Sequence, residues 1–347
     1  MPHILILGGS LFLGRHLVET AVPLGWNVTV FNRGKTRPEP LPGAEHVQGD
    51  RVADLGRLAG RRWDAIIDTC GYIPAAVSVA GRTLRDAAEL YVFISSISAY
   101  ATFRPWGDET DALAELAPGA AADVVTAHTY GSLKVLCERE AHRAFPGGTL
   151  IVRPGFIVGP YDPTGRFSYW VHRIAAGGQV LVPAVPEQPL QLIDARDLAS
   201  WILGCIAERT VGTFDVVGPA AAGAPRAYRF ADVMHAIARV AGANAAELVW
   251  ADTAWLSRMG VSPEDLPFWE DVTDWDAERR NPARALARGL RTRPLAETIA
   301  DTLAWLRAGT DSRSTDAGNR RSGSMTRDRE AAVVAACLAQ RGPHATA

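Results

Sequence analysis

Tyr130 and Lys134 are the two residues of this sequence whose types and spacing point most directly to chemistry. Residues four apart share one face of a helix, and the segment around them has a helical pattern. A free tyrosine has a pKa of about 10, too high for efficient proton transfer at neutral pH. A neighbouring ammonium lowers that pKa because it stabilises the phenolate. The pair therefore indicates a tyrosine acid/base assisted by a lysine, whose long stem can also reach a ribose hydroxyl.

Lysine is rare in this chain, which makes its position informative. Of the 36 lysine and arginine residues only two are lysines, Lys35 and Lys134. With seven tyrosines and two lysines among 347 residues, chance placement gives roughly 0.04 Tyr-x-x-x-Lys spacings. A lysine retained against such an arginine background indicates a site that arginine cannot serve.

A run of hydroxyl groups follows the apolar segment 90–94 and could supply a third member of the site. The run contains Ser95, Ser96 and Ser98. In parallel sheets ligands bind beyond the carboxyl ends of the strands, which is where this run would lie. We therefore expect one of these serines to face the same site as Tyr130.

A glycine-rich segment from Gly8 to Gly14 lies between an N-terminal apolar strand and a helical pattern. Glycines at such a turn let backbone N–H groups approach a pyrophosphate at the helix N-terminus. The spacing is not G-x-G-x-x-G, so the prediction depends on the place of the segment between strand and helix. An ordinary strand-to-helix turn is the alternative. The residues expected to contact the cofactor here are Gly8, Gly9, Ser10, Phe12, Leu13 and Gly14.

The end of the second predicted strand distinguishes between two dinucleotide cofactors. An acidic residue at this position would bind the 2′-hydroxyl of NAD. This chain has Asn32 and Arg33 there, followed by Lys35. Cations in place of a carboxylate suit the 2′-phosphate of NADP, since a guanidinium can bind phosphate through two parallel hydrogen bonds. The sequence therefore favours NADP over NAD, and a solvated basic turn is the alternative.

The elements that must position these residues alternate between strand and helix in the first half of the chain. The strands are short apolar runs separated by helical patterns, the first of which covers 14–24. This alternation predicts an α/β fold, a Rossmann-type doubly wound parallel sheet with helices on both faces. The predicted strands are 3–7, 27–31, 64–68, 90–94 and 149–152.

The second half of the chain is less regular and predicts a smaller C-terminal substrate lobe. The helices expected there are 167–176, 230–241 and 294–307, and the strands are 190–193 and 213–217. The tail is poor in residues that could be buried, so we expect it to be largely disordered, with a short helix at 330–340 as an alternative. The predicted domains are a Rossmann domain at 1–165 plus about 190–218, a substrate lobe at 166–189 and 219–308, and a tail at 309–347.

Two long loops have open interpretations. The aromatic loop 263–275 would suit either a cap on the core or a lid over substrate. The stretch 101–129 is long for a structureless connection, which favours a lid over the site. Within it, Asp108 and Glu109 form either a carboxylate pair or part of a solvated loop, and His128 could line the pocket.

Composition and charge exclude several other classes of protein. A net charge of −2 gives no electrostatic reason to expect nucleic acid as a partner. No stretch approaches the roughly 18 apolar residues of a membrane span, and the N-terminus has no basic leader, so we expect a cytoplasmic protein. The four cysteines are far apart, which argues against a disulfide framework and against a metal site. A small molecule is the expected partner.

These segments together resemble the short-chain dehydrogenase/reductase superfamily, and 153–160 resembles its extended, NAD-dependent epimerase/dehydratase branch. The resemblance covers about 3–307. It implies that Ser96, four residues before Tyr100, is the catalytic hydroxyl that orients the substrate oxygen. It also implies cofactor contacts from Asp50 and Arg51 near the adenine, Gly71 beside the cofactor, Lys134 at the nicotinamide ribose, and Pro154 with Ile157 near the nicotinamide.

The glycine loop and the turn after the second strand depart from the pattern of that branch. Extended members usually read G-x-x-G-x-x-G, but Leu11 occupies the middle position here. Leu11 and the turn at Asn32 and Arg33 are similar to an atypical subgroup, the chloroplast stem-loop-binding proteins.

Two further departures bear on the reaction. Dehydratases of the branch carry an Asp-Glu pair directly after the catalytic hydroxyl, whereas Ile97 and Ser98 follow Ser96 here. Sugar dehydration is therefore disfavoured. Nucleotide-sugar enzymes tend to carry a diphosphate-binding arginine where this chain has Gln188, which weakens the expectation of a sugar-nucleotide substrate.

The sequence favours an oxidoreductase that interconverts a ketone and an alcohol of a small organic or natural-product-type substrate, with NADP as cofactor. Ser96 would bind the reacting oxygen, Tyr130 would move its proton, and Lys134 would assist Tyr130. One alternative is an NAD-retaining epimerase of a nucleotide sugar. Another is an RNA-binding protein on the same fold, which the neutral charge disfavours. The resemblance is also compatible with a homodimer formed through the Tyr130 helix.

Overall fold

The computed structural model describes residues 1–35, 39–221, 223, 225–242, 246–309 and 325–341. The chain divides into two compact units. The first comprises Met1–Ile157, Gln191–Ala227 and Asp276–Thr292, and the second comprises Val158–Leu190, Tyr228–Trp275 and Arg293–Ala347.

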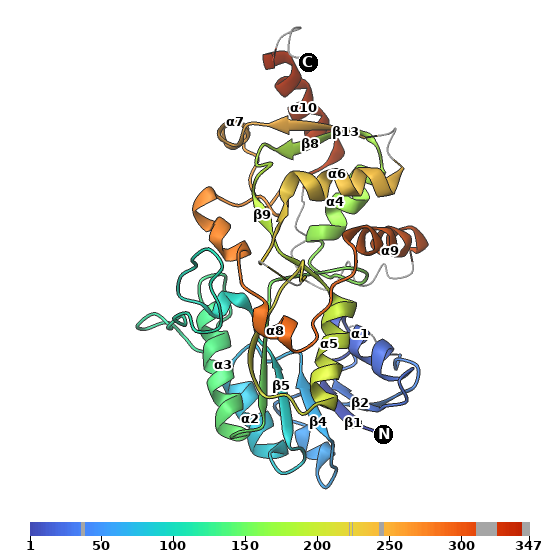
Figure 1. Cartoon of the computed structure of the whole chain (residues 1–347), viewed down its shortest axis with the longest axis vertical. Helices are drawn as coiled ribbons and strands as arrows, with labels where there is room; N and C mark the ends of the chain where they lie inside the picture. Colours follow the sequence, from blue (N-terminus) through green and yellow to red (C-terminus); the bar gives the residue numbers. More distant parts are fainter. Residues whose placement is uncertain (36–38, 222, 224, 243–245, 310–324, 342–347) are drawn as a thin grey trace. The chain divides into compact units, whose positions relative to one another are not determined.

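The first unit is built on a seven-stranded parallel sheet with the strand order β11-β6-β5-β4-β1-β2-β3 (Figure 1). Its inner strands are buried along almost their whole length and consist mostly of apolar residues, as expected of a parallel sheet that is covered on both faces. The predicted doubly wound α/β fold is thereby confirmed. The strands are β1 (His3–Leu7), β2 (Asn27–Asn32), β3 (Ala44–Gln48), β4 (Ala65–Asp68), β5 (Leu90–Ile94), β6 (Thr149–Pro154) and β11 (Gly212–Val216).

Two pairs of helices cover the two faces of this sheet (Figure 1). Helices α1 (Phe12–Ala21) and α5 (Ala195–Ala207) pack together on one face. Helices α2 (Pro74–Leu84) and α3 (Tyr130–Ala144) pack together on the other. Helix α3 carries both Tyr130 and Lys134, so the sheet face that it covers determines where these two residues lie.

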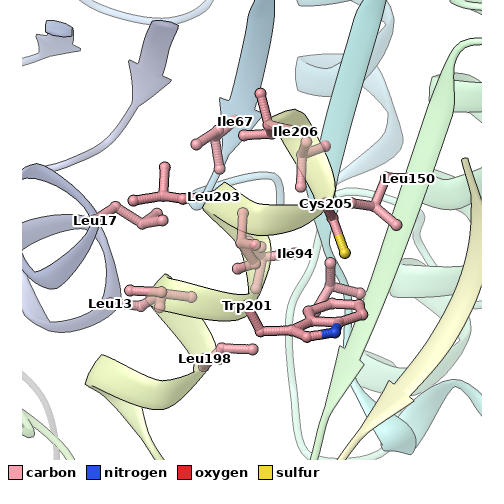
Figure 2. Packing of buried hydrophobic residues seen from close by; sticks show 14 of the residues in the cluster. Leu13, Leu17, Ile67, Ile94, Leu150, Leu198, Trp201, Leu203, Cys205 and Ile206 are labelled. Atoms are coloured by element: carbon pink, nitrogen blue, oxygen red, sulfur yellow. The ribbon is translucent and has the colours of Figure 1, made fainter. Parts of the chain in front are cut away.

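Two hydrophobic clusters fill the space between the sheet and its helices. Alternate residues of a strand point to opposite faces, so Ile6 joins the cluster beneath α1 and α5 while Leu5 joins the cluster beneath α2 and α3. Each large aliphatic side chain buried in this way stabilises the fold by about 1.5–3 kcal/mol. Figure 2 shows the first cluster, with Leu13, Leu17, Ile67, Ile94, Leu150, Leu198, Trp201, Leu203, Cys205 and Ile206 labelled.

The register of the sheet aligns the carboxyl ends of its central strands. Leu7 at the end of β1 pairs with Asp68 at the end of β4, and Asp68 pairs with Phe93 near the end of β5. Ile94 in turn pairs with Val152 of β6. The segments that follow these strands therefore begin at one edge of the sheet, which is where parallel sheets bind ligands.

The second unit is the smaller C-terminal lobe and combines helices with two short strand pairs. Strand β8 (Gly178–Pro183) pairs in parallel with β13 (Ala246–Ala251). Strand β9 (Pro189–Leu190) pairs antiparallel with β12 (Tyr228–Arg229). The helices of this unit are α4 (Arg166–Ala175), α6 (Phe230–Ala241), α7 (Thr253–Arg258), α9 (Leu295–Ala308) and α10 (Arg327–Arg341).

The segment 276–292 belongs to the first unit, although the sequence assigned it to the substrate lobe. The reason is a buried arginine, Arg280, whose Nε donates to Asp215 at the end of β11 over 2.9 Å. The remaining short elements of the chain are η1 (Leu55–Leu58), η2 (Ile97–Ala99), η3 (Val272–Glu278), α8 (Ala283–Ala287), β7 (Phe156–Val158) and β10 (Leu192–Asp194).

Helix α10 (Arg327–Arg341) confirms the short helix that the sequence allowed at 330–340, within a tail otherwise expected to be largely disordered. It begins at Arg327, and Glu330 in its first turn forms a buried ion pair with Arg173 of α4 at 2.6 Å. The same carboxylate accepts a hydrogen bond from the backbone N–H of Leu181 in β8. Residues 310–324 and 342–347 of the predicted tail lie outside the described residues.

The aromatic loop 263–275 caps the core of the second unit, which is one of the two interpretations of its sequence. The indole nitrogen of Trp170 donates to the carbonyl of Pro267 over 2.7 Å. Phe268 and Trp269 are both buried. The backbone of Phe268 has a φ of 67°, a left-handed conformation that costs free energy for residues other than glycine.

Among the helices of the described residues, none is long and apolar enough to span a bilayer. Within that same part of the chain, no group of three or more His, Cys, Asp or Glu side chains is arranged to hold a metal ion. The four cysteines carry free thiols.

Candidate active site

Ser96 lies directly beyond the end of β5 and starts the short turn η2. Its hydroxyl oxygen accepts a hydrogen bond from the backbone N–H of Ser98 at 3.1 Å, and it contacts the Ser98 hydroxyl at the same distance. Ser96 is half-buried, whereas the preceding Ser95 is buried and donates to Glu138 of α3 over 2.5 Å. The strand end therefore directs one serine into the protein and leaves the other accessible to a ligand.

The first turn of α3 packs directly against the Ser96 turn. A Cβ placed on Gly131 would lie 1.9 Å from the carbonyl oxygen of Ser98, so only glycine permits this approach. Tyr130, the first residue of α3, is brought to the same turn. The glycine within the Tyr-x-x-x-Lys segment thus has a defined role, which is to let the helix that carries the tyrosine reach the serine turn.

Lys134 is buried one helical turn further along α3. Its Nζ donates to the carbonyl of Ile94 over 2.6 Å and to the carbonyl of Gly71 over 2.9 Å. Its ammonium also lies 4.4 Å from the ring centroid of Phe93. Burial lowers the pKa of Lys134 to about 8. The lysine therefore joins α3 to the ends of two neighbouring strands, β4 and β5.

Tyr72 is a residue of this site that the sequence interpretation missed. It follows Gly71, and its ring centroid lies 5.4 Å from the Nζ of Lys134. Although Tyr72 is half exposed, the protein atoms around its hydroxyl remove water from it. This desolvation, and after it the neighbouring Tyr130, raise the pKa of Tyr72 to about 12. Its position just after the end of a central strand was the only signal in the sequence that could have identified it.

The glycine loop is shaped by backbone conformations that require glycine. Gly8 has a φ of 105° and Gly9 a φ of 79°, both in the region that disfavours a Cβ. A Cβ on Gly14 would lie 2.5 Å from the Cα of Gly9. Leu11, by contrast, has an extended backbone with φ −120°. The replacement of the middle glycine by leucine therefore causes no backbone strain.

Helix α1 begins at Phe12 without a capping side chain. Its N-cap residue, Leu11, makes no side-chain hydrogen bond to the first turn. The first N–H groups of any helix lack partners within the helix, and they form a ready site for an anionic group. Ser10 and Leu13 flank this helix start. The loop thus has the features that a pyrophosphate requires.

Asn32 braces the glycine loop from the end of β2. Its Nδ2 donates to the carbonyl of Gly8 over 2.9 Å, and its Oδ1 accepts from the backbone N–H of Gly34 at 2.8 Å. Arg33 and Lys35 are both exposed at this end of the sheet. The cations predicted to bind a 2′-phosphate are therefore accessible, while the asparagine is committed to the loop.

Asp50 and Arg51 use their side chains within the protein. The Asp50 carboxylate accepts from the backbone N–H groups of Val52 and Ala53, and these hydrogen bonds lower its pKa. The Arg51 guanidinium forms two parallel hydrogen bonds of 2.7 Å with Asp68. Burial alone would raise the pKa of the Asp68 carboxyl, but the charge and hydrogen bonds of Arg51 hold it below its usual value.

Arg51 therefore supports the segment that carries Gly71. Asp68 also accepts from the hydroxyl of Tyr91 at 2.6 Å and from the backbone N–H of Cys70. These bonds fix the chain just before Gly71, whose carbonyl binds Lys134. The implied contact between Asp50 or Arg51 and adenine stays a prediction.

Pro154 and Ile157 lie where β6 ends and β7 begins. Pro154 is buried and pairs with Val216 of β11, whereas Ile157 is half-buried. Both therefore lie at the carboxyl edge of the sheet beside the end of β5. His128, in contrast, is exposed.

Gln188, in the second unit, forms hydrogen bonds through both the nitrogen and the oxygen of its side-chain amide. The side chain is fully buried. Its Nε2 donates to the carbonyl of Phe268 over 2.5 Å, and its Oε1 accepts from the backbone N–H of Glu270 at 3.1 Å. Gln188 therefore holds the aromatic loop 263–275 in place, and this role accounts for a buried polar residue at that position.

Comparisons with known proteins agree with this architecture. Residues 4–216 match the model of the NAD dependent epimerase/dehydratase family. The chain is 27% identical over 219 residues to chloroplast stem-loop binding protein of 41 kDa b from Arabidopsis thaliana, a match that covers 58% of this chain and 54% of that protein. The chain thus matches about half the length of this curated relative.

Solved structures of the same fold include enzymes with a bound dinucleotide. The Bordetella bronchiseptica enzyme WbmH in complex with NAD+ has a TM-score of 0.66 at 16% identity, covering 88% of this chain and 99% of that one. UDP-glucuronic acid 4-epimerase from Bacillus cereus in complex with NAD has a TM-score of 0.64 at 13% identity, covering 89% and 100%. At such identities the likeness concerns the fold.

Proposed function

The chain belongs to the NAD-dependent epimerase/dehydratase family, and on that premise we propose that it transfers hydride between a nicotinamide cofactor and an alcohol or ketone carbon of a small organic substrate. The observation that carries the proposal is the junction at Lys134. Its Nζ binds the carbonyl that precedes the serine run and the carbonyl of Gly71, and it lies on the helix that begins with Tyr130.

The residues present fit a dinucleotide. The uncapped start of α1 offers backbone N–H groups to a pyrophosphate, and the left-handed glycines Gly8 and Gly9 shape the turn that leads to this helix start. The remaining contacts proposed for the cofactor come from Ser10, Phe12, Leu13, Gly14, Asn32, Arg33, Lys35, Asp50, Arg51, Gly71, Lys134, Pro154 and Ile157. When bound, the nicotinamide supplies or accepts the hydride.

The protein side chains would handle the proton and the oxygen. Ser96 donates a hydrogen bond to the substrate oxygen and so fixes its position. Tyr130 gives its phenolic proton to that oxygen during reduction and takes it back during oxidation. The positive charge of Lys134 favours the phenolate of Tyr130 and so brings its pKa closer to neutrality. The buried position of Lys134 strengthens this effect because little water screens its charge.

We propose NADP as the preferred cofactor. Arg33 and Lys35 are exposed at the end of β2, and Asn32, which occupies the place of the NAD-binding carboxylate, is committed to Gly8. The solved structures of similar fold that contain NAD favour NAD as the cofactor instead. Titration of the purified protein with NADPH and NADH, followed by fluorescence, separates the two.

We expect NADPH to bind about tenfold more tightly than NADH, a difference of about 1.4 kcal/mol. The double variant Arg33→Ala/Lys35→Ala should bind both equally. If the unchanged protein binds NADPH and NADH equally, the NADP preference is refuted but the proposed hydride transfer is not. Failure to bind either dinucleotide would overturn the whole proposal.

A Tyr130→Phe variant tests the chemistry. It should keep cofactor affinity and lose turnover by at least about a hundredfold on any ketone or alcohol that the unchanged protein uses. Full turnover by this variant would show that Tyr130 is not the acid/base. The assay is the consumption of NADPH across a panel of small ketones.

An NAD-retaining epimerase is the second candidate, favoured by the titles of solved structures such as the Bacillus cereus epimerase. It would co-purify with NAD and show no net consumption of added cofactor. The commitment of Gln188 to the loop 263–275 argues against a sugar diphosphate at that position. A binding role like that named for the Arabidopsis relative would need neither Tyr130 nor Lys134. RNA gel-shift assays test this role, and we expect them to show no binding.

The proposed homodimer through α3 is a separate expectation. Light scattering during size-exclusion chromatography gives the mass of the particle, and a monomer at micromolar concentration would contradict it.

A further inference from the structure

Arg280 is the centre of a buried ionic network in the first unit. Its side chain is completely buried. Nε donates to Asp215 over 2.9 Å, Nη1 donates to Asp111 over 2.7 Å, and Nη2 donates to the carbonyl of Asp108 over 2.6 Å. All three nitrogens of the guanidinium are thus engaged with the protein, so Arg280 is not placed to bind a substrate.

The network encloses the ring of Tyr100. The guanidinium carbon of Arg280 lies 3.7 Å from the ring centroid, and that of Arg153 lies 4.8 Å from it. The Tyr100 hydroxyl donates to Asp215 over 2.7 Å. Cations near an aromatic ring are attracted to it most strongly when water is excluded. Tyr100 is therefore fixed through its ring and through its hydroxyl.

Tyr100 ends the turn that Ser96 begins. The backbone N–H of Tyr100 donates to the carbonyl of Ile97, which closes η2. At the start of the same turn, the buried Ser95 is held by Glu138, and Glu138 is held in turn by Arg153 through two hydrogen bonds. The two ends of the Ser96 turn are thus fastened to one connected set of charged side chains.

Arg280 also holds the stretch 101–129, which follows this turn. Asp108 and Asp111 belong to the stretch 101–129, and Glu109 accepts a hydrogen bond from the backbone N–H of Asp215 at 2.8 Å. The stretch also joins Ala99 through the backbone N–H of Ala114. The sequence did not decide between a carboxylate pair and a solvated loop for Asp108 and Glu109. In the structure both residues help to attach the stretch 101–129 to Arg280 and Asp215.

We propose that Arg280 acts through Tyr100 as a positioning residue for Ser96, holding its hydroxyl where it meets the substrate oxygen. The inference deepens the proposed function and rests on it. Neither Arg280 nor Tyr100 contacts the reacting atoms. Their effect is to restrict the Ser96 turn, and small displacements of a catalytic group reduce turnover strongly.

A double-mutant cycle separates positioning from a general loss of stability. Tyr100→Phe keeps the ring between the two arginines and removes only the hydrogen bond to Asp215. We expect it to lower kcat about tenfold in the unchanged protein and less than about twofold in a Ser96→Ala background, because its effect passes through Ser96. The KM for the cofactor should stay the same. Equal losses of kcat in the two backgrounds would overturn the proposal.

Arg280→Lys provides a second variant, and Arg173→Lys provides its control. Like Arg280, Arg173 is a buried arginine in an ion pair, but its partner is Glu330 and both residues belong to the second unit. Hydrogen–deuterium exchange in the absence of substrate should rise at 95–101 and 108–114 in Arg280→Lys, and not in Arg173→Lys. Unchanged exchange in these segments would refute the anchoring role even if Tyr130 proves not to be the acid/base.

Discussion

The ammonium nitrogen of Lys134 lies 2.6 Å from the carbonyl oxygen of Ile94, the last residue of β5. This contact crosses from the helix that begins with Tyr130 to the strand that ends at the serine run. Lys134 therefore holds the helix of the proposed acid/base, Tyr130, against the strand that leads to Ser96. Arginine at this position would have to fit a larger planar group into a space shaped for one nitrogen.

Replacement of Lys134 by methionine should abolish catalysis. We expect kcat to fall by at least about a hundredfold, because Tyr130 loses the charge that stabilises its phenolate. Steady-state kinetics with NADPH is the measurement. An active Lys134→Met variant would contradict the proposed role.

The same variant also has a predicted pH signature in stability. Burial lowers the pKa of Lys134 from 10.5 to about 8. Between these values the unfolded chain binds more protons than the folded one, so the stability of the unchanged protein rises with pH in this window. Relative to Lys134→Met, it should gain about 3 kcal/mol between pH 8 and pH 10.5. Urea unfolding at several pH values measures the gain, and a constant difference would show that the lysine is not desolvated.

Gly131→Ala should separate α3 from the serine turn. The new Cβ would lie 1.9 Å from the carbonyl oxygen of Ser98, so the helix must move. We expect a stability loss of about 1–3 kcal/mol together with a loss of turnover. The control is Gly204→Ala in α5, where a Cβ meets nothing within 4 Å. That variant should instead gain about 0.5–1 kcal/mol.

Gly14→Ala should weaken cofactor binding. A Cβ at this position would lie 2.5 Å from the Cα of Gly9 and would force the glycine loop to open. We expect the Kd for NADPH to rise at least about tenfold, or 1.4 kcal/mol. Gly56→Ala, in η1 and with open space around its Cβ, should leave the Kd unchanged. An unaffected Kd in Gly14→Ala would place the pyrophosphate elsewhere.

Glu270→Gln should stabilise the protein above neutral pH. Burial, and after it the charge of Asp274, raise the pKa of Glu270 from 4.5 to about 7, and its Oε2 is buried without a hydrogen-bond partner. Because the folded pKa is raised, the carboxyl favours folding most below pH 4.5, and this contribution is lost as pH rises through 7. The variant should be about 2 kcal/mol more stable at pH 8 and nearly equal at pH 4.5. Thermal unfolding at the two pH values tests it, and the opposite order would refute the assignment.

The strands that the sequence predicted well are those that are buried on both faces. β1 and β5 have the bounds that their apolar runs indicated, and helix α6 matches its pattern from Phe230 to Ala241. Strand β3, at the edge of the sheet, was missed because most of its residues are partly exposed and no apolar run marks it. The predicted strand 190–193 is in fact two short strands, because Gln191 between them bonds to Glu278 and Arg280.

The parts of the site that could be predicted are those whose partners are near in sequence. Tyr130 and Lys134 are recognisable because a helix brings residues four apart together. The Arg280 network could not be predicted in this way. Its partners Asp215 and Asp111 are 65 and 169 residues away, and only the folded chain shows which of 34 arginines is buried against them.

Gln188 limits how this protein can be re-engineered or can diverge. An arginine introduced there to accept a diphosphate would lose the amide that holds both the Phe268 carbonyl and the Glu270 N–H. The loop would then need a compensating change before any new substrate could be selected. A substitution at Gln188 therefore acts on the folding of the C-terminal lobe as well as on any ligand that would bind beside it.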